Sequence, residues 1–167
     1  QGDAESEDVG ARVGVVHAPA LGWTFSAGLG LGAFRSGERL AVSQAPSIEQ
    51  ALLVTGFPYD RKTARDNNFA QFLHLKRRAQ GIRRLGSAAL DLSLVAAGSL
   101  DGYWEMKLKP WDIAAGLLLA SEAGAKLSDW QGRPVELSRG EVLCASPHLH
   151  AELLAALRHI EHGVFTP

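Results

Sequence analysis

Two acids, Glu105 and Asp112, stand on either side of Pro110 and are the residues best placed to do chemistry. Asp112 opens a segment, residues 113–124, in which Glu122 is the only charge. A helix that is apolar on nearly every side must be buried, so an acid at its start either caps the helix or faces a cation. Carboxylate oxygens are ligands that Mg²⁺ prefers. From the residues alone, a helix cap is the favoured interpretation of Asp112, with a cation ligand as the alternative.

Glu105 belongs to a stretch, Tyr103–Lys109, that alternates with the period of a strand. The alternation places Tyr103, Glu105 and Lys107 on one face. Glu105 is therefore either half of a surface pair with Lys107 or part of a pocket shared with Asp112. Upstream, Ser87 is placed to cap a helix over residues 88–97 that Gly98 ends.

The first third of the chain has the pattern of an antiparallel meander. We expect strands over 13–19, 21–28 and 39–43, with turns at 19–22 and 35–38. Gly28, Gly30 and Ala33 match a loose dinucleotide-binding pattern, but that site needs a helix to begin there, and a turn and a strand follow. We therefore reject the dinucleotide site and expect the glycines to relieve crowding or form bulges.

The rest of the chain alternates apolar strands with amphipathic helices. Buried strands are predicted over 51–57 and 141–147, a further strand over 82–85, and a hairpin over 127–137 with its turn at Gln131–Gly132. Helices are predicted over 67–79 and 148–159. Their inward residues are predicted to be Phe69, Phe72, Leu73 and Leu75 in the first, and Leu149, Leu153, Leu154 and Leu157 in the second. The domain division is a mobile acidic tail (1–8), strands of an N-terminal sheet (9–46), an α/β domain (47–162) and a short tail (163–167).

The composition is that of a soluble globular protein, with 46% hydrophobic and 21% charged residues in 167. A net charge of -1 gives no general attraction to nucleic acid or to an anionic membrane. No apolar run is long enough to span a bilayer. The single cysteine, Cys144, excludes an internal disulfide and favours a cytoplasmic location, with Cys144 as inert core.

Two other groups of residues invite a functional interpretation. The first is a cluster of basic residues, most simply explained as cations that interact favourably with the C-terminal end of a helix dipole, although part of it could raise the positive potential near a phosphate pocket. Four histidines near the C-terminus have no spacing that fits a zinc site, so we expect them to face water. The basic cluster comprises Lys76, Arg77, Arg78, Arg83 and Arg84, and the histidines are His148, His150, His159 and His162.

One continuous stretch carries a resemblance to a known family. The sequence GIRRLGSAALDLSLVAAGSLDGYWE, followed by WDIAAGLLLASEAGA, resembles the C-terminal half of the inositol monophosphatase family of magnesium-dependent, lithium-sensitive sugar phosphatases. Similarity extends from about Val13 to about Leu154. The resemblance implies an α/β layered fold, in which an antiparallel meander sheet is followed by a mixed sheet flanked by helices. It also implies a homodimer.

By position, the resemblance implies that Asp112 binds Mg²⁺ and that Glu105 contacts substrate hydroxyls. It also implies that the turn of Gly86, Ser87 and Ala88 lies against the substrate. The family's first motif, an Asp-Pro-hydrophobic-Asp-Gly-Thr run, and its upstream Glu do not occur in the sequence. The catalytic base is therefore unknown and expected in an N-terminal portion outside this chain.

These departures make the functional expectation conditional. If the chain works together with an N-terminal portion that carries the missing motifs, the complete protein is expected to be a Mg²⁺-dependent phosphatase for inositol monophosphate or a similar polyol phosphate. Related substrates are fructose bisphosphate, nucleotide bisphosphate and histidinol phosphate. Alone, the 167 residues are expected to show negligible activity and to be a degenerate binding or structural relative, because a multi-metal site needs several converging carboxylates.

Overall fold

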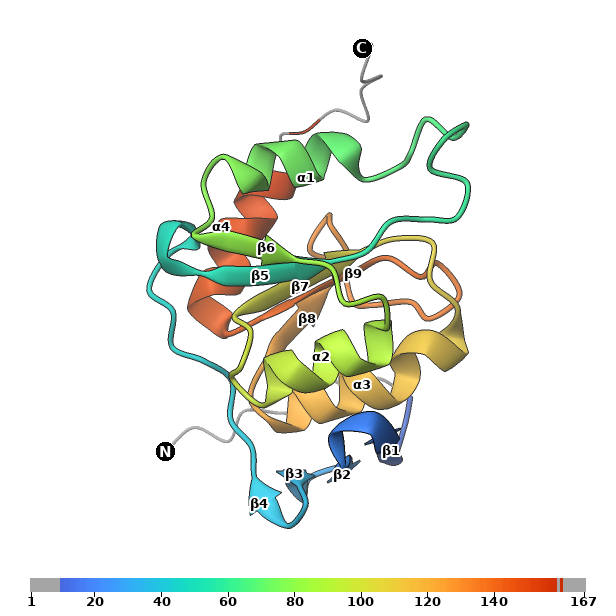
Figure 1. Ribbon diagram of the computed structural model, residues 1–167, viewed down its shortest axis with the longest axis vertical. Coiled ribbons are helices and arrows are strands. Elements are labelled where there is room, and N and C mark those ends of the chain that lie inside the picture. Colours follow the sequence, from blue (N-terminus) through green and yellow to red (C-terminus); the bar gives the residue numbers. More distant parts are fainter. Residues whose placement is uncertain (1–9, 159, 161–167) are drawn as a thin grey trace.

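The computed structural model describes residues 10–158 and 160, which form four layers (Figure 1). Helices α1 (Phe69–Lys76) and α4 (Pro147–Arg158) cover one face of a five-stranded sheet. Helices α2 (Ala88–Ala96) and α3 (Pro110–Glu122) lie between that sheet and a four-stranded one. The α/β layered fold implied by the sequence is confirmed. The predicted tails, 1–8 and 163–167, lie outside the described residues.

The four-stranded sheet is a meander in which each strand pairs antiparallel with the next. Its strands are β1 (Val13–Ala18), β2 (Trp23–Gly28), β3 (Gly32–Arg35) and β4 (Glu38–Arg39). The short 3-10 helix η1 (Pro19–Leu21) connects β1 to β2. The strand predicted over 39–43 is wrong, because β4 ends at Arg39. The chain then leaves the sheet, and the Val42 amide donates to the carbonyl of Ala123 just after α3.

A turn that the sequence did not predict separates β2 from β3. Gly30 and Gly32 have φ of 73° and 92°, which favour glycine, so they form a turn rather than bulges. Their amides donate to the Glu122 carboxylate, from Gly30 N to Oε1 at 2.8 Å and from Gly32 N to Oε2 at 2.7 Å. The only charge in the apolar part of α3 therefore ties that helix to the meander. A strand follows the glycines, in agreement with rejection of the dinucleotide site.

The five-stranded sheet is mixed. Its strands, in spatial order, are β6 (Gly81–Arg83), β5 (Leu52–Thr55), β7 (Gly102–Glu105), β9 (Val142–Ala145) and β8 (Lys126–Ser128). β5 pairs parallel with β6 and β7, whereas β9 is antiparallel to β7 and β8. All four residues of β9 are buried, Cys144 among them, as predicted. The strand predicted over Tyr103–Lys109 ends at Glu105, and Lys107 has a positive φ of 59°.

The buried helix predicted after Asp112 is confirmed. α3 contacts β1, β2 and β3 on one side and β8 on the other, and α2 runs beside it. Its aliphatic side chains are fully buried: Ile113, Leu117, Leu118 and Leu119. A Cβ at Gly116 would lie 2.8 Å from Leu92, so a glycine there lets α2 and α3 approach closely. The start of α3 is thereby held at a fixed place between the layers.

The outer helices confirm one predicted apolar stripe and correct the other. In α4, Leu149, Leu153 and Leu157 are buried and Leu154 is partly buried, as predicted. In α1, Leu75 is buried and Phe72 is partly buried, but Phe69 and Leu73 are each 38% exposed. Gln71 is buried in their place.

The hairpin predicted over 127–137 is wrong. β8 pairs with β9 instead, and a closed turn follows it. The Asp129 carboxylate accepts hydrogen bonds from the amides of Gln131 (2.8 Å) and Arg133 (2.9 Å) and from Arg133 Nε (2.6 Å). An aspartate that binds the amides of the following residues stabilises a local turn in preference to a strand ladder. Pro134, which has no N–H to donate, reinforces this outcome.

The histidine prediction is wrong for His150. His150 is 1% exposed and its Nε2 lies 2.9 Å from Ser128 Oγ. Burial lowers the pKa of His150 to about 4. His148 is exposed, as predicted, and its Nε2 lies 3.0 Å from the carbonyl oxygen of Pro46. His159 and His162 lie outside the described residues.

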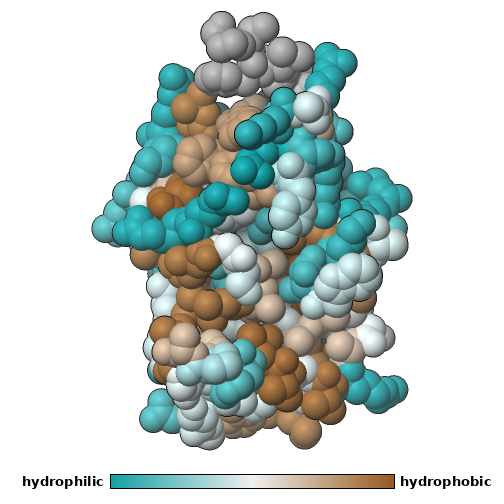
Figure 2. Space-filling view, turned by 45° about the vertical axis from the view of Figure 1, so that its right-hand side comes forward, coloured by the Kyte–Doolittle hydropathy of each residue, from teal (hydrophilic) through white to brown (hydrophobic). Residues whose placement is uncertain are grey.

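The outer face of the four-stranded sheet is partly apolar. Val13 and Val15 of β1 are 75% and 57% exposed, and Leu31 of the β2–β3 turn is 71% exposed. Figure 2 shows hydrophobic side chains gathered at the end of the molecule where Figure 1 places this sheet. Among residues 10–158, no helix is long and apolar enough to cross a bilayer.

Candidate functional site

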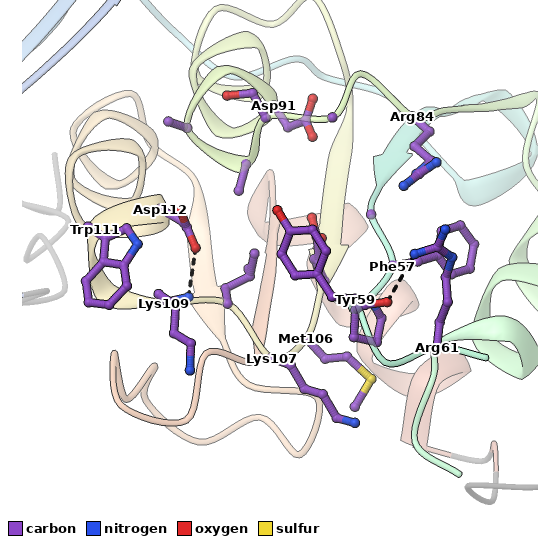
Figure 3. A pocket seen from close by; sticks show the side chains of 18 residues that line it. Phe57, Tyr59, Arg61, Arg84, Asp91, Met106, Lys107, Lys109, Trp111 and Asp112 are labelled. Atoms are coloured by element: carbon purple, nitrogen blue, oxygen red, sulfur yellow. Dashed lines mark hydrogen bonds between the residues drawn. The ribbon is translucent and has the colours of Figure 1, made fainter. Parts of the chain in front are cut away.

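A cavity of about 360 Å³ opens where four segments of the described chain meet (Figure 3). They are the loop after β5, the end of β7, and the first turns of α2 and α3. All the predicted site residues line this one cavity: Gly86, Ser87, Ala88, Glu105 and Asp112. The fold therefore brings together residues that the sequence placed on a turn, a strand and a helix.

Asp112 lies in the first turn of α3, which Pro110 opens. Its Oδ2 accepts a hydrogen bond from the Lys109 amide at 3.0 Å, which Figure 3 marks with a dashed line. This is the reciprocal half of a capping box, so the capping interpretation is confirmed. The carboxylate also lines the cavity, and Oδ1 has no hydrogen-bond partner among the described residues. Capping uses one oxygen and leaves the other for a ligand.

Glu105 ends β7 and is held by a buried tyrosine on the same face of the strand. Tyr103 Oη donates to Glu105 Oε2 at 2.9 Å. Lys107 instead donates to Asp60 Oδ2 at 2.8 Å, so the surface pair between Glu105 and Lys107 is wrong. Burial raises the pKa of Glu105, although the Tyr103 hydrogen bond and the positive charge of Arg84 act in the opposite direction. Glu105 therefore lies in the pocket.

The turn before α2 has the predicted structure. Gly86 has a φ of 91°, a conformation that favours glycine, and Ser87 Oγ accepts from the Leu90 amide at 3.4 Å. Ser87 is thus the N-cap of α2, as expected. Gly86, Ser87 and Ala88 all line the cavity, so the positive end of the α2 dipole lies at its wall.

A third acid in the cavity wall, Asp91, was missed. Asp91 is 1% exposed, and its Oδ1 has no hydrogen-bond partner. Burial, and after it the charge of Glu105, raises the pKa of Asp91 to about 7. Its position four residues after Ser87 was the available signal, because residues four apart share a helix face.

Cations line the same cavity as the acids. Arg84, from the predicted basic cluster, lines the cavity with its guanidinium 5.7 Å from the centre of the Phe57 ring. Figure 3 shows Arg61 and Arg84 on one side of the cavity and Asp112 on the other. Arg78 of the same cluster instead bonds to Glu152 at 2.7 Å, on the far side of the sheet. Of the five residues in the basic cluster, Arg84 therefore raises the positive potential at the cavity, whereas Arg78 forms an ion pair away from it.

The loop after β5 supplies another part of the cavity wall. Phe57, Tyr59 and Arg61 line the cavity, and Tyr59 is fully exposed at its rim. Lys107 and Lys109 also line it. A cavity with both acids and bases in its wall can bind a cation together with an anion.

Comparison with known proteins identifies the family. The sequence profile of the inositol monophosphatase family matches residues 7–162. The chain belongs to the inositol monophosphatase family. The family resemblance and the fold that it implied are thus confirmed.

Relatives and solved structures agree with this assignment. The chain is 46% identical over 145 residues to the inositol-1-monophosphatase of Synechocystis sp., covering 87% of this chain and 50% of the relative. It is 41% identical over 146 residues to the Nus factor SuhB of Pseudomonas aeruginosa, covering 86% and 54%. The structure of the inositol monophosphatase from Anabaena (Nostoc) sp. matches with a TM-score of 0.87 and 43% identity, covering 90% of this chain and 60% of that one. The chain spans about half the length of the curated relatives it matches.

Proposed function

We propose that this chain carries the substrate-recognition half of a Mg²⁺-dependent phosphatase for inositol monophosphate or a similar polyol phosphate. The observation that supports the proposal is the convergence of Glu105, Asp112 and the turn at Gly86–Ala88 on one cavity. A phosphate monoester needs positive groups and its metal needs negative ones, and this cavity is lined by both.

In this proposal Asp112 is a Mg²⁺ ligand. Its half-buried carboxylate lines the cavity, and Oδ1 has no partner among the described residues, so it fits the role. Magnesium takes near-octahedral oxygen coordination, and no three His, Cys, Asp or Glu side chains in residues 10–158 and 160 converge to hold a metal. The remaining ligands would come from water, from substrate and from polypeptide outside the described residues. Bound Mg²⁺ would supply a Lewis acid for the phosphoryl oxygens.

Glu105 and the turn before α2 recognise the substrate. Tyr103 occupies Oε2 of Glu105, which orients the carboxylate so that it can accept hydrogen bonds from ring hydroxyls. Amides around Gly86, Ser87 and Ala88, at the N-terminus of α2, are suited to donate to substrate oxygens. We assign no catalytic base to this chain. We further propose a homodimer, which the family resemblance implies, located in the cytoplasm. The net charge of -1 supports the absence of a nucleic-acid or membrane partner.

Phosphate release tests the proposal. Inorganic phosphate would be measured with Mg²⁺ present, for the whole protein as its gene encodes it and for the 167-residue chain alone. The substrates are inositol 1-phosphate, fructose bisphosphate, a nucleotide bisphosphate and histidinol phosphate, ranked by kcat/KM. We expect inositol 1-phosphate to rank first, lithium to inhibit, and the chain alone to be inactive.

Each contrary result would remove a different part of the proposal. Inositol 1-phosphate in last place would contradict the polyol substrate. Robust turnover by the 167-residue chain alone would contradict the requirement for acids outside it.

A further inference from the structure

Gly56, immediately after β5, lies directly against the carboxyl group of Glu105. A Cβ built on Gly56 would overlap all three carboxyl atoms of Glu105, namely Cδ, Oε1 and Oε2, at separations below the 3.0 Å that real Cβ atoms keep. Gly56 does not have a positive φ, so its backbone conformation does not require glycine. Glycine is needed at this position because the carboxyl group of Glu105 occupies the space that a side chain would take.

Tyr103 holds the same carboxylate by a hydrogen bond. Its hydroxyl donates to Glu105 Oε2 at 2.9 Å, and its side chain is fully buried. Gly56 and Tyr103 together leave the Glu105 side chain little freedom to rotate. A carboxylate held in this way loses little conformational entropy when it binds a ligand.

A buried polar network fixes the backbone of Gly56. Asn68 Nδ2 donates to the Gly56 carbonyl at 2.7 Å and to Thr55 Oγ1 at 2.9 Å, while Asn68 Oδ1 accepts from Trp104 Nε1 at 2.7 Å. Thr55 Oγ1 also donates to the Trp104 carbonyl. Asn68, Thr55 and Trp104 are each at most 1% exposed. Because Trp104 precedes Glu105 on β7, the network sets Gly56 and Glu105 at a fixed separation.

We propose that Gly56 is a positioning residue for Glu105. The missing side chain gives the carboxylate the place from which it meets the hydroxyls of a polyol, so any larger residue at this position weakens substrate recognition. The inference rests on the proposed function in one respect, that Glu105 contacts the substrate. The packing of Glu105 on Gly56 stands without it.

A double-mutant cycle in the whole protein tests the inference. Gly56→Ala should raise KM for inositol 1-phosphate by roughly tenfold or more with a smaller change in kcat, because a hydrogen bond to a charged group is misplaced. Glu105→Asp withdraws the carboxylate by one methylene, so in the Gly56→Ala background it should lower KM again instead of adding to the loss. Gly81→Ala is the matched control. Its new Cβ meets only the flexible ends of Leu52 (3.1 Å) and Arg83 (3.3 Å), away from the cavity, so KM should not change.

Thermal unfolding needs no substrate, so it separates this inference from the proposed function. It is measured for the four proteins of the cycle, which are the wild type, Gly56→Ala, Glu105→Asp and the double variant. Gly56→Ala should lower the unfolding midpoint by roughly 2–4 °C or more, and Glu105→Asp should restore part of that loss. Additive effects on the midpoint would overturn the packing of Glu105 on Gly56. A coupled midpoint with an unchanged KM would overturn the positioning role. If the wild-type protein hydrolyses none of the phosphates, the proposed function fails, while coupling in the midpoint still supports the contact.

Discussion

The two acids of α3 have the same chemistry and opposite surroundings. Glu122, at the end of the helix, has both oxygens bound by the amides of Gly30 and Gly32. Asp112, in the first turn, has one oxygen bound by the Lys109 amide and lines the cavity. The helix dipole favours an acid at the position of Asp112 and disfavours one at the position of Glu122. An acid held against the dipole by two amides stabilises the fold, whereas one with an unused oxygen at a cavity can bind a ligand.

The largest expected effect comes from Asp112→Asn. Asparagine can still accept the Lys109 amide, so the free energy of unfolding should change little. The charge that would hold a metal is lost, so kcat/KM with Mg²⁺ should fall by roughly 100-fold or more. Phosphate release and urea unfolding measure the two quantities. Equal losses in the isosteric Glu122→Gln variant would abolish the contrast between the two acids.

Glu122→Ala should have the converse effect. Two hydrogen bonds to a partly exposed carboxylate are lost and the glycine turn loses its anchor on α3, so the free energy of unfolding should fall by about 1–3 kcal/mol. KM should stay the same, since Glu122 does not line the cavity. Urea unfolding combined with steady-state kinetics checks this. A raised KM at unchanged stability would show that Glu122 acts on the site.

Asp91→Asn sharpens the comparison with a third acid, one that is buried with Oδ1 unpaired. The folded pKa, raised to about 7 from 3.8, means that the folded state disfavours the ionised form. The contribution of Asp91 to the free energy of unfolding is therefore fully present below pH 3.8 and is lost as the pH rises through about 7. The variant, which cannot ionise, should be more stable than wild type at about pH 8, by on the order of 1–2 kcal/mol.

Unfolding measured across the pH range decides this prediction. The advantage of Asp91→Asn should shrink toward pH 4. An advantage that is independent of pH would mean that Asp91 does not titrate in the folded protein.

Local patterns predicted the parts of the fold whose partners are close in sequence. Ser87 as a helix cap, Gly98 as a helix end and the apolar stripe of α4 all depend on neighbours within one or two turns. The family motif predicted which residues share the cavity. One failure involves a distant partner, because His150 is buried beside Ser128, 22 residues away. The other is local, because Asp129 binds the amides two and four residues after it and closes a turn where a hairpin was expected.

The site shows the same division. Glu105 and Asp112 could be selected from the sequence, because a strand ending in an acid and a proline-opened helix starting with one are local features. Phe57 and Arg61 could not, because their place in the wall depends on how the loop after β5 approaches β7. Asp91 had a local signal, its position one helical turn after Ser87, that was not used. Gly56 looked like an ordinary residue at the end of a strand until the position of Glu105 was known.

The sequence by itself determined the helices, the central strands, the family and the acids that could do chemistry, since these depend on periodicity, capping and a long motif. The tertiary structure decided which of those acids still has a free oxygen. That question depends on amides brought from segments far away along the chain, as the contacts of Glu122 with Gly30 and Gly32 show. A carboxylate can bind a ligand only where the fold leaves one of its oxygens without a hydrogen-bond donor.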